Sequence, residues 1–240
     1  MPTSYRTALL GAALLALLVP TSAHAQYGSG GAGLVLAIPQ GAFADRIDGV
    51  GYGLGAEFVV HVPNTPVGFG LAGTFVVYGQ ETIRERFGGG ALGRVDVDVV
   101  TTNNIALGHA FVRLQPPIGA FRPYADALVG FSYLFTESRI EDVDFNDDRD
   151  IASSTNFDDG AFSYGIGGGV MAQVYSGRPE GTGRAISVFV DARVRYLFGG
   201  EADYLREGSI DTDRDGNLTF DVTRSRTDLL LPQLGVTVRF

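Results

Sequence analysis

Apolar and polar side chains alternate residue by residue along most of the chain, and this period of two is that of β-strands with two unlike faces. Eight segments carry it, at about residues 30–38, 50–62, 67–79, 95–115, 122–135, 160–175, 185–198 and 225–240. Each is near or above the roughly 9–11 residues with which a tilted strand crosses a bilayer. Bacterial single-chain membrane barrels have an even number of strands. The pattern therefore predicts an all-β fold, an eight-stranded antiparallel up-and-down transmembrane β-barrel.

The segments between the predicted strands alternate in length. Three short connections rich in proline or glycine, at 63–66, 115–121 and 176–184, are typical of periplasmic turns. Longer polar connections at 80–94, 136–159 and 199–224, with a shorter one at 39–49, are typical of external loops. Both ends of the predicted barrel then lie on the periplasmic side.

One face of each strand is apolar and the other holds glycine and charge. At the C-terminal end Leu234, Val236, Val238 and Phe240 alternate with Gly235, Thr237 and Arg239. The same sorting puts charged residues on one face of segments 50–62, 122–135 and 185–198. Aromatic residues near the strand ends predict a girdle at the membrane interfaces: Tyr52, Tyr133, Phe135, Tyr196, Phe198 and Phe240. A lipocalin-like or jelly-roll barrel would alternate too, but with its apolar face inside. Alternation alone does not choose between them.

The first residues have the pattern of an export signal. Arg6 precedes an apolar run that ends before Pro20, and Ala23-His24-Ala25 forms a small-residue cleavage site. We predict a signal peptide at residues 1–25 and a barrel domain at residues 26–240. The apolar run is shorter than the ~20 residues of a membrane helix.

Composition narrows the possible partners. The net charge is −9, lysine and cysteine are absent, and no basic stripe is present, which disfavours nucleic acid as a partner. Acidic external loops account for the excess charge.

These features together resemble the small outer-membrane β-barrel family of Gram-negative bacteria, with its OmpA-, OmpX- and OmpW-like barrel domains. The marks are the signal ending in Ala23-His24-Ala25, the eight alternating segments, and a last strand ending in Phe240. The resemblance implies location in the cell outer membrane, contact with outer-membrane lipid, and recognition of the last strand by the insertion machinery. It implies a monomer, and it leaves activity open because such barrels serve as anchors, adhesins, small channels and occasional enzymes.

Charged residues on the inward face are the main candidates for function. Glu57, Asp126, Asp191, Arg193, Arg195 and Arg239 mix both signs. An eight-stranded barrel is barely wide enough for its own side chains, so we expect these groups to pair and plug the lumen. The alternative is a narrow polar pore.

No catalytic, cofactor or metal site is predicted, with one weak exception. Asp211, Asp213 and Asp215 have the spacing of a calcium loop, but Val222 stands where a bidentate glutamate belongs. A solvated turn is the competing interpretation. His61 and His109 are the histidines after the signal. His61 falls near the periplasmic end of its strand, His109 has no nearby serine, and no nucleophile pair is evident, which disfavours a hydrolase. The run Gly165 to Gly169 has no helix after it and is interpreted as small residues on a strand.

Three functions are compatible with the sequence. The first is a structural anchor that displays acidic surface loops. The second is a small channel for ions or apolar solutes. The third is a surface adhesin or binding module with calcium-ordered loops.

Overall fold

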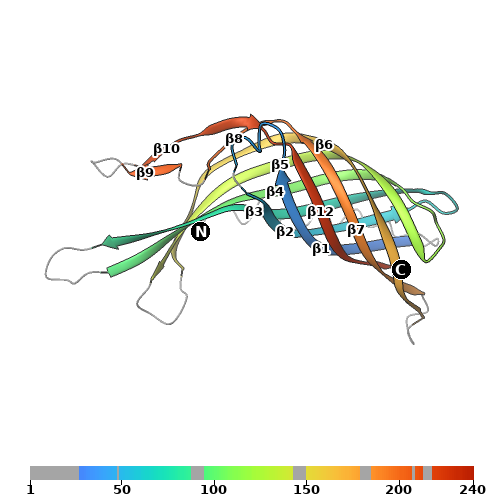
Figure 1. Ribbon diagram of the computed structural model, residues 1–240. Coiled ribbons are helices and arrows are strands. Elements are labelled where there is room, and N and C mark those ends of the chain that lie inside the picture. Colours follow the sequence, from blue (N-terminus) through green and yellow to red (C-terminus); the bar gives the residue numbers. More distant parts are fainter. Residues whose placement is uncertain are drawn as a thin grey trace, which may run out of the picture.

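Eight strands close into an antiparallel barrel in the computed structural model, which describes residues 27–47, 49–87, 95–142, 150–178, 185–206, 209–212 and 218–240. The order around the barrel is β1-β12-β7-β6-β5-β4-β3-β2 (Figure 1). The barrel strands are β1 (Tyr27–Pro39), β2 (Gly51–His61), β3 (Val67–Phe87), β4 (Val95–Leu114), β5 (Phe121–Asp142), β6 (Asp150–Gly177), β7 (Ile186–Gly199) and β12 (Leu229–Arg239). All eight predicted segments are barrel strands, which confirms the fold class.

The barrel closes between its first and last strands. Ser29 lies opposite Arg239, and the register runs on to Pro39 opposite Leu229. The Phe240 amide donates a 3.0 Å hydrogen bond to the Gly28 carbonyl. The predicted signal peptide lies outside the described residues and stays a prediction.

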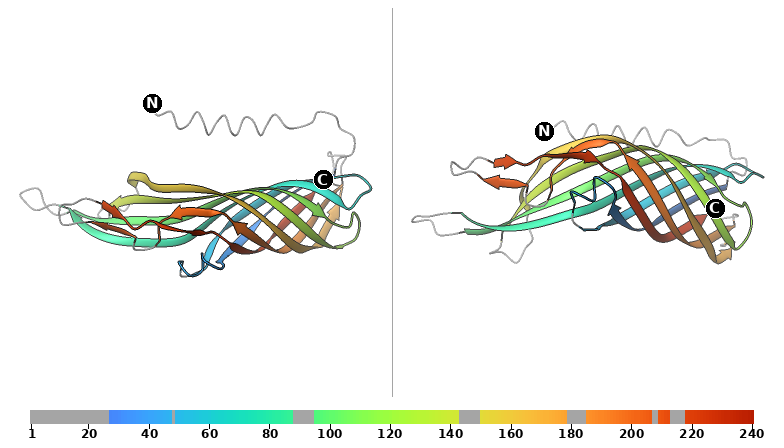
Figure 2. Two further views of the ribbon diagram at one scale, coloured as in Figure 1. Left: turned by 90° about the horizontal axis from the view of Figure 1, so that it is seen from above. Right: turned by 45° about the horizontal axis from the view of Figure 1, so that its top comes forward.

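Three strands, β3, β5 and β6, extend well beyond the predicted segments. The β3–β4 pairing continues to Phe87 opposite Val95, and the β5–β6 pairing continues to Glu141 opposite Asp150. Much of the predicted loops 80–94 and 136–159 is therefore strand, and that part of the prediction is wrong. Polar strands extend beyond the barrel because pairing needs only backbone groups and no apolar face. These hairpins project from the end that carries the long connections, called the outer end here (Figures 1 and 2).

The outward face of the barrel is apolar. Large exposed side chains surround the barrel, with Leu34 70%, Phe131 60%, Ile166 64% and Leu234 61% exposed. Neighbouring aromatic rings form part of the predicted girdle toward the outer end, including Tyr196 and Phe198 with ring centroids 4.8 Å apart. A soluble barrel would turn these side chains inward, so the lipocalin-like alternative is excluded and the outward face is the lipid-facing belt. None of the described residues forms a helix long and apolar enough to cross a bilayer.

The interior of the outer half is an apolar core. Its buried side chains come from most barrel strands and from the segments above them: Val35, Ala37, Phe43, Ile47, Val76, Tyr78, Ile105, Leu107, Leu134, Ala161, Leu197, Ala202, Tyr204, Leu229 and Leu231. Most of these side chains are apolar and pack without needing hydrogen-bond partners. Buried polar residues of the same half, such as Asn103 and Thr136, hydrogen-bond to each other.

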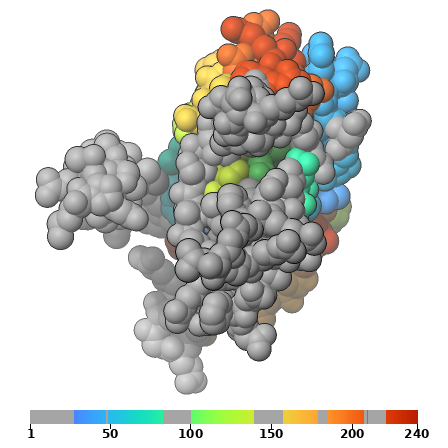
Figure 3. Space-filling view, turned by 90° about the vertical axis from the view of Figure 1, so that its left-hand side faces the viewer, coloured from blue at the N-terminus to red at the C-terminus, as the bar shows by residue number. Residues whose placement is uncertain are grey.

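Two segments, residues 40–47 and 201–205, cover this core at the outer end and are called the outer plug. Phe43 is fully buried, and its ring meets the Tyr204 ring edge-on at 5.2 Å between centroids. The Tyr78 hydroxyl donates to the Leu205 carbonyl at 3.2 Å, which ties the plug to β3. Burial raises the pKa of the Tyr204 phenol above its usual value, so this side chain stays neutral at physiological pH. Figure 3 shows the β1–β2 connection and the segment around β8 side by side at the outer rim.

The predicted loop 199–224 contains more structure than expected. Strand β8 (Glu201–Tyr204) pairs with β11 (Thr223–Arg226), and β9 (Ile210–Thr212) pairs with β10 (Leu218–Phe220). Among the predicted calcium ligands, Asp213 and Asp215 lie outside the described residues. Asp211 belongs to β9, but its side chain is not described. The calcium site stays a prediction.

Candidate site in the barrel lumen

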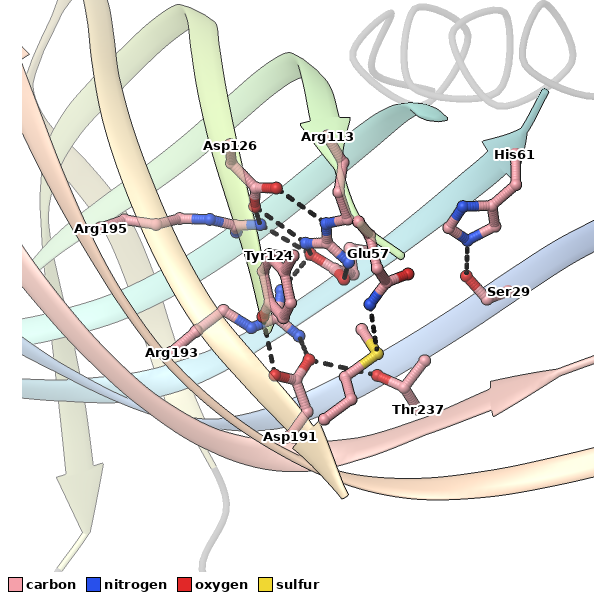
Figure 4. A network of polar contacts seen from close by, with 12 residues as sticks. Ser29, Glu57, His61, Arg113, Tyr124, Asp126, Asp191, Arg193, Arg195 and Thr237 are labelled. Atoms are coloured by element: carbon pink, nitrogen blue, oxygen red, sulfur yellow. Dashed lines mark hydrogen bonds and ion pairs between the residues drawn. The ribbon is translucent and has the colours of Figure 1, made fainter. Parts of the chain in front are cut away.

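Six charged side chains meet inside the half of the barrel farther from the plug. Alternation turns Glu57 of β2, Arg113 of β4, Asp126 of β5, and Asp191, Arg193 and Arg195 of β7 into the lumen, and they are called the lumen network (Figure 4). Each is buried, at most 7% exposed. Three carboxylates face three guanidinium groups, so the network is neutral as a whole.

Arg113 lies at its centre. Its guanidinium donates Nη1 to Glu57 Oε1 at 2.8 Å and Nη2 to Glu57 Oε2 at 3.2 Å. It also donates Nε to Asp126 Oδ1 at 2.7 Å and Nη2 to Asp126 Oδ2 at 2.8 Å. The planar fork of arginine suits two bidentate partners, and a lysine offers no such geometry. Its Cζ also lies 3.9 Å from the centroid of the Tyr124 ring, a cation–π contact.

Two arginines of β7 complete the crossing of the lumen. Arg195 donates Nη2 to Glu57 Oε2 at 2.7 Å and to Asp126 Oδ2 at 3.0 Å. Arg193 bonds Glu57 with one terminal nitrogen and Asp191 with the other, the latter at 2.5 Å. Because β2 and β7 are three positions apart around the barrel, these bonds run across the lumen and not along the wall.

Neutral partners complete the hydrogen bonding of Asp191. The Tyr124 hydroxyl donates to Asp191 Oδ1 at 2.7 Å, and the Thr237 hydroxyl donates to Oδ2 at 3.3 Å. Buried charge is tolerated when it is paired and hydrogen-bonded in this way.

Glycines on β6 make room for the network. A Cβ at Gly169 would lie 2.6 Å from the Tyr124 hydroxyl oxygen, and one at Gly167 would lie 2.6 Å from Arg195 Cγ. The interpretation of this glycine run as small residues on a strand is confirmed.

Five of the six charged residues predicted to face the lumen join the network. Arg239 does not: it lies at the inner mouth, where its Nη1 donates to the Pro117 carbonyl at 3.3 Å. Arg113 was not among the predicted lumen residues, although its strand was predicted. Alternation places Arg113 on the same face as His109, and this signal would have identified it as the third arginine of the lumen in place of Arg239.

The prediction that His109 has no nearby serine is wrong in space, and His61 has a serine beside it too. His109 Nε2 lies 3.1 Å from Ser163 Oγ, and His61 Nε2 lies 3.2 Å from Ser29 Oγ. The pairing of β1 with β2, and of β4 and β6 with β5, brings together residues 32 and 54 positions apart in sequence. All four side chains are buried. In the described part of the chain, no carboxylate hydrogen-bonds either imidazole to complete a catalytic triad.

The described residues hold no group of three or more histidine, cysteine or acidic side chains arranged for a metal ion. The acidic members of the lumen network have arginine partners in the places where a cation would bind. The charged side chains of the lumen network therefore form ion pairs with one another inside the barrel.

Comparison with protein-family models and with curated proteins gives no match. Among solved structures, the chain is similar to Ail, the attachment invasion locus protein of Yersinia pestis, in complex with the heparin analogue sucrose octasulfate. The identity is 13%, the match covers 90% of this chain and 99% of Ail, and the TM-score is 0.41.

Two other solved structures are similar at the same level. Neisserial surface protein A is 14% identical, with 91% and 97% of the two chains covered and a TM-score of 0.38. A major outer membrane protein from Thermus thermophilus is 16% identical, with 90% and 100% covered and a TM-score of 0.38. Likenesses at this level say nothing about activity and assign the chain to none of the OmpA, OmpX or OmpW families. The strand order and the outward apolar belt of this chain themselves make it a small eight-stranded β-barrel of the outer-membrane type.

Proposed function

We propose that this protein is a non-enzymatic, non-conducting outer-membrane barrel that anchors acidic segments at the cell surface. The observation that carries the proposal is the lumen network, whose hydrogen bonds connect β2, β4, β5 and β7 across the interior. Its central side chain, Arg113, is fully buried.

Two different layers support a sealed lumen. The lumen network fills the half of the barrel nearer the inner end with paired charges. The apolar core fills the other half and is covered by the outer plug, in which Phe43 and Leu205 are fully buried. An ion would have to displace paired arginines in one layer and packed side chains in the other, and both steps are unfavourable.

The distribution of carboxylates supports the display of acidic segments. Among the described residues, all acidic residues except Glu57, Asp126 and Asp191 belong to strand ends or connections at the outer end. Arginines in the same segments neutralise this charge only in part. An acidic surface of this kind favours a cationic partner and disfavours an anionic one.

Planar-bilayer recording tests the proposal. The purified full chain, refolded and inserted at high protein loading, is expected to give no current steps. A conductance in the wild type that disappears in Arg193→Ala/Arg195→Ala would overturn the sealed anchor and establish the small channel. Arg224→Ala/Arg226→Ala is the matched control, since both of these arginines are exposed at the outer end.

A further inference from the structure

A groove crosses the lipid-facing belt over four adjacent strands, β1, β12, β7 and β6. Its volume is about 610 Å³, and its apolar walls include Leu34 and Leu36 of β1, Val194 of β7 and Leu234 of β12. β1, β12 and β7 lie side by side on the face turned toward the viewer in Figure 1. Arg193 of the lumen network also lines the groove, whereas no residue of the outer plug does.

The groove exists because small side chains stand where the belt elsewhere carries large ones. Gly168 and Ala192 form its floor, while the outward neighbours Ile166 and Val194 are large and exposed. The hollow therefore results from the small size of these residues and does not depend on a flexible loop.

Pro232 adds a local break in the strand pairing at the same place. The β1–β12 register runs to Val35 opposite Gln233 and resumes at Ile38 opposite Leu230. Proline has no N–H, so it cannot donate to the carbonyl of Leu36 opposite it, and the ladder is interrupted there. The wall therefore lacks one ladder hydrogen bond beneath the groove.

The position of the groove identifies its occupant. Leu34 and Leu36 are 70% and 50% exposed within the belt that faces lipid, so hydrocarbon covers them. A second copy of the chain fits poorly, because two convex barrels meet along a narrow line and leave a groove across four strands largely unfilled. A flexible chain of methylenes can follow it.

We propose that this groove binds one acyl chain of a membrane lipid more persistently than the rest of the belt does. The proposal rests on the membrane location of the barrel but not on whether the lumen conducts. In the groove, the acyl chain exchanges contacts with mobile lipid chains for contacts with fixed protein side chains on several sides.

Native mass spectrometry of the full chain, extracted in mild detergent from phosphatidylethanolamine vesicles, tests the proposal. Ala192→Phe fills the groove from its floor. Ala127→Phe is the matched control, because both alanines are exposed on the outward face of a barrel strand. We expect one retained phosphatidylethanolamine per wild-type or Ala127→Phe chain and at least a fivefold lower retained fraction for Ala192→Phe.

Leu34→Ala, which removes a wall without adding bulk, is a second variant and is expected to lose lipid as well. A boiling-dependent mobility shift on gels confirms that each variant is folded. Equal retention by wild type and Ala192→Phe overturns the proposal, as does a wild type that retains no lipid. A dimer that Ala192→Phe dissociates also overturns it and assigns the groove to a second copy. A current in planar bilayers would contradict the sealed lumen and leave this result unaffected.

Discussion

Removing the central cation of the lumen network is the most informative perturbation. Arg113→Met keeps much of the side-chain volume and deletes all four hydrogen bonds to Glu57 and Asp126. Both carboxylates stay buried, and the lumen acquires a net charge of about −1.

The structure sets the size of the expected effect. Breaking a buried ion pair by removing one partner costs about 3–5 kcal/mol. Glu57 keeps Arg193 and Arg195 as partners. Asp126 keeps Arg195, so neither carboxylate is left without a cationic partner. We therefore expect the lower end, a loss of about 3 kcal/mol in the free energy of unfolding, or more than a hundredfold in the equilibrium constant.

Equilibrium urea unfolding in lipid vesicles measures this loss. The chain has no tryptophan, so circular dichroism and mobility on unboiled gels report the folded fraction. Arg224→Met is the control: Arg224 is 66% exposed and lies 3.3 Å from Glu201, which is 63% exposed. An exposed pair of this kind contributes less than about 1 kcal/mol.

A second variant separates charge from packing. Arg113→Met/Asp126→Asn restores neutrality in the lumen and is expected to recover at least ~1 kcal/mol relative to the single variant. Equal losses for Arg113→Met and Arg224→Met would refute the reasoning, because the network would then contribute no more than a surface pair.

Other variants test the glycine and plug assignments. Gly169→Val places a Cβ 2.6 Å from the Tyr124 hydroxyl oxygen and is expected to cost about 1–3 kcal/mol in urea unfolding. Gly73→Val, with open space around its Cβ, should change stability by less than about 0.5 kcal/mol. Similar losses for both would show that the close approach is unimportant. Phe43→Ala removes a fully buried ring from the outer plug. Amide hydrogen exchange in residues 40–47 should therefore accelerate at least tenfold, while the barrel strands stay protected. Unchanged exchange in residues 40–47 would mean that the ring does not hold the plug.

Much of the fold follows from local pattern. Alternation located all eight barrel strands. It sorted their faces best around the lumen network, because a strand that separates lipid from charged or small residues changes polarity at every residue. The aromatic positions near strand ends were predictable for the same reason. The extensions of β3, β5 and β6 were not, since polar strands outside the membrane carry no such constraint.

The site was only partly predictable. Alternation tells which side of the wall a residue faces, but not which residues on opposite walls meet. That depends on barrel closure and stagger, which placed Arg113 in the network and Arg239 at the mouth. The register of β4 and β6 on β5, in which both residues lie opposite Gly130, brought His109 to Ser163, a contact invisible in sequence. The outer plug depends on how two connections pack against each other, which no periodicity encodes.

The most direct test of the account is fractionation of cells that express the full chain, followed by gel migration of the detergent-extracted protein with and without boiling. A closed barrel with an outward apolar belt predicts recovery with outer membranes and a boiling-dependent shift in mobility. A soluble protein whose mobility is the same before and after boiling would contradict it, and every lipid-facing assignment would then be reversed.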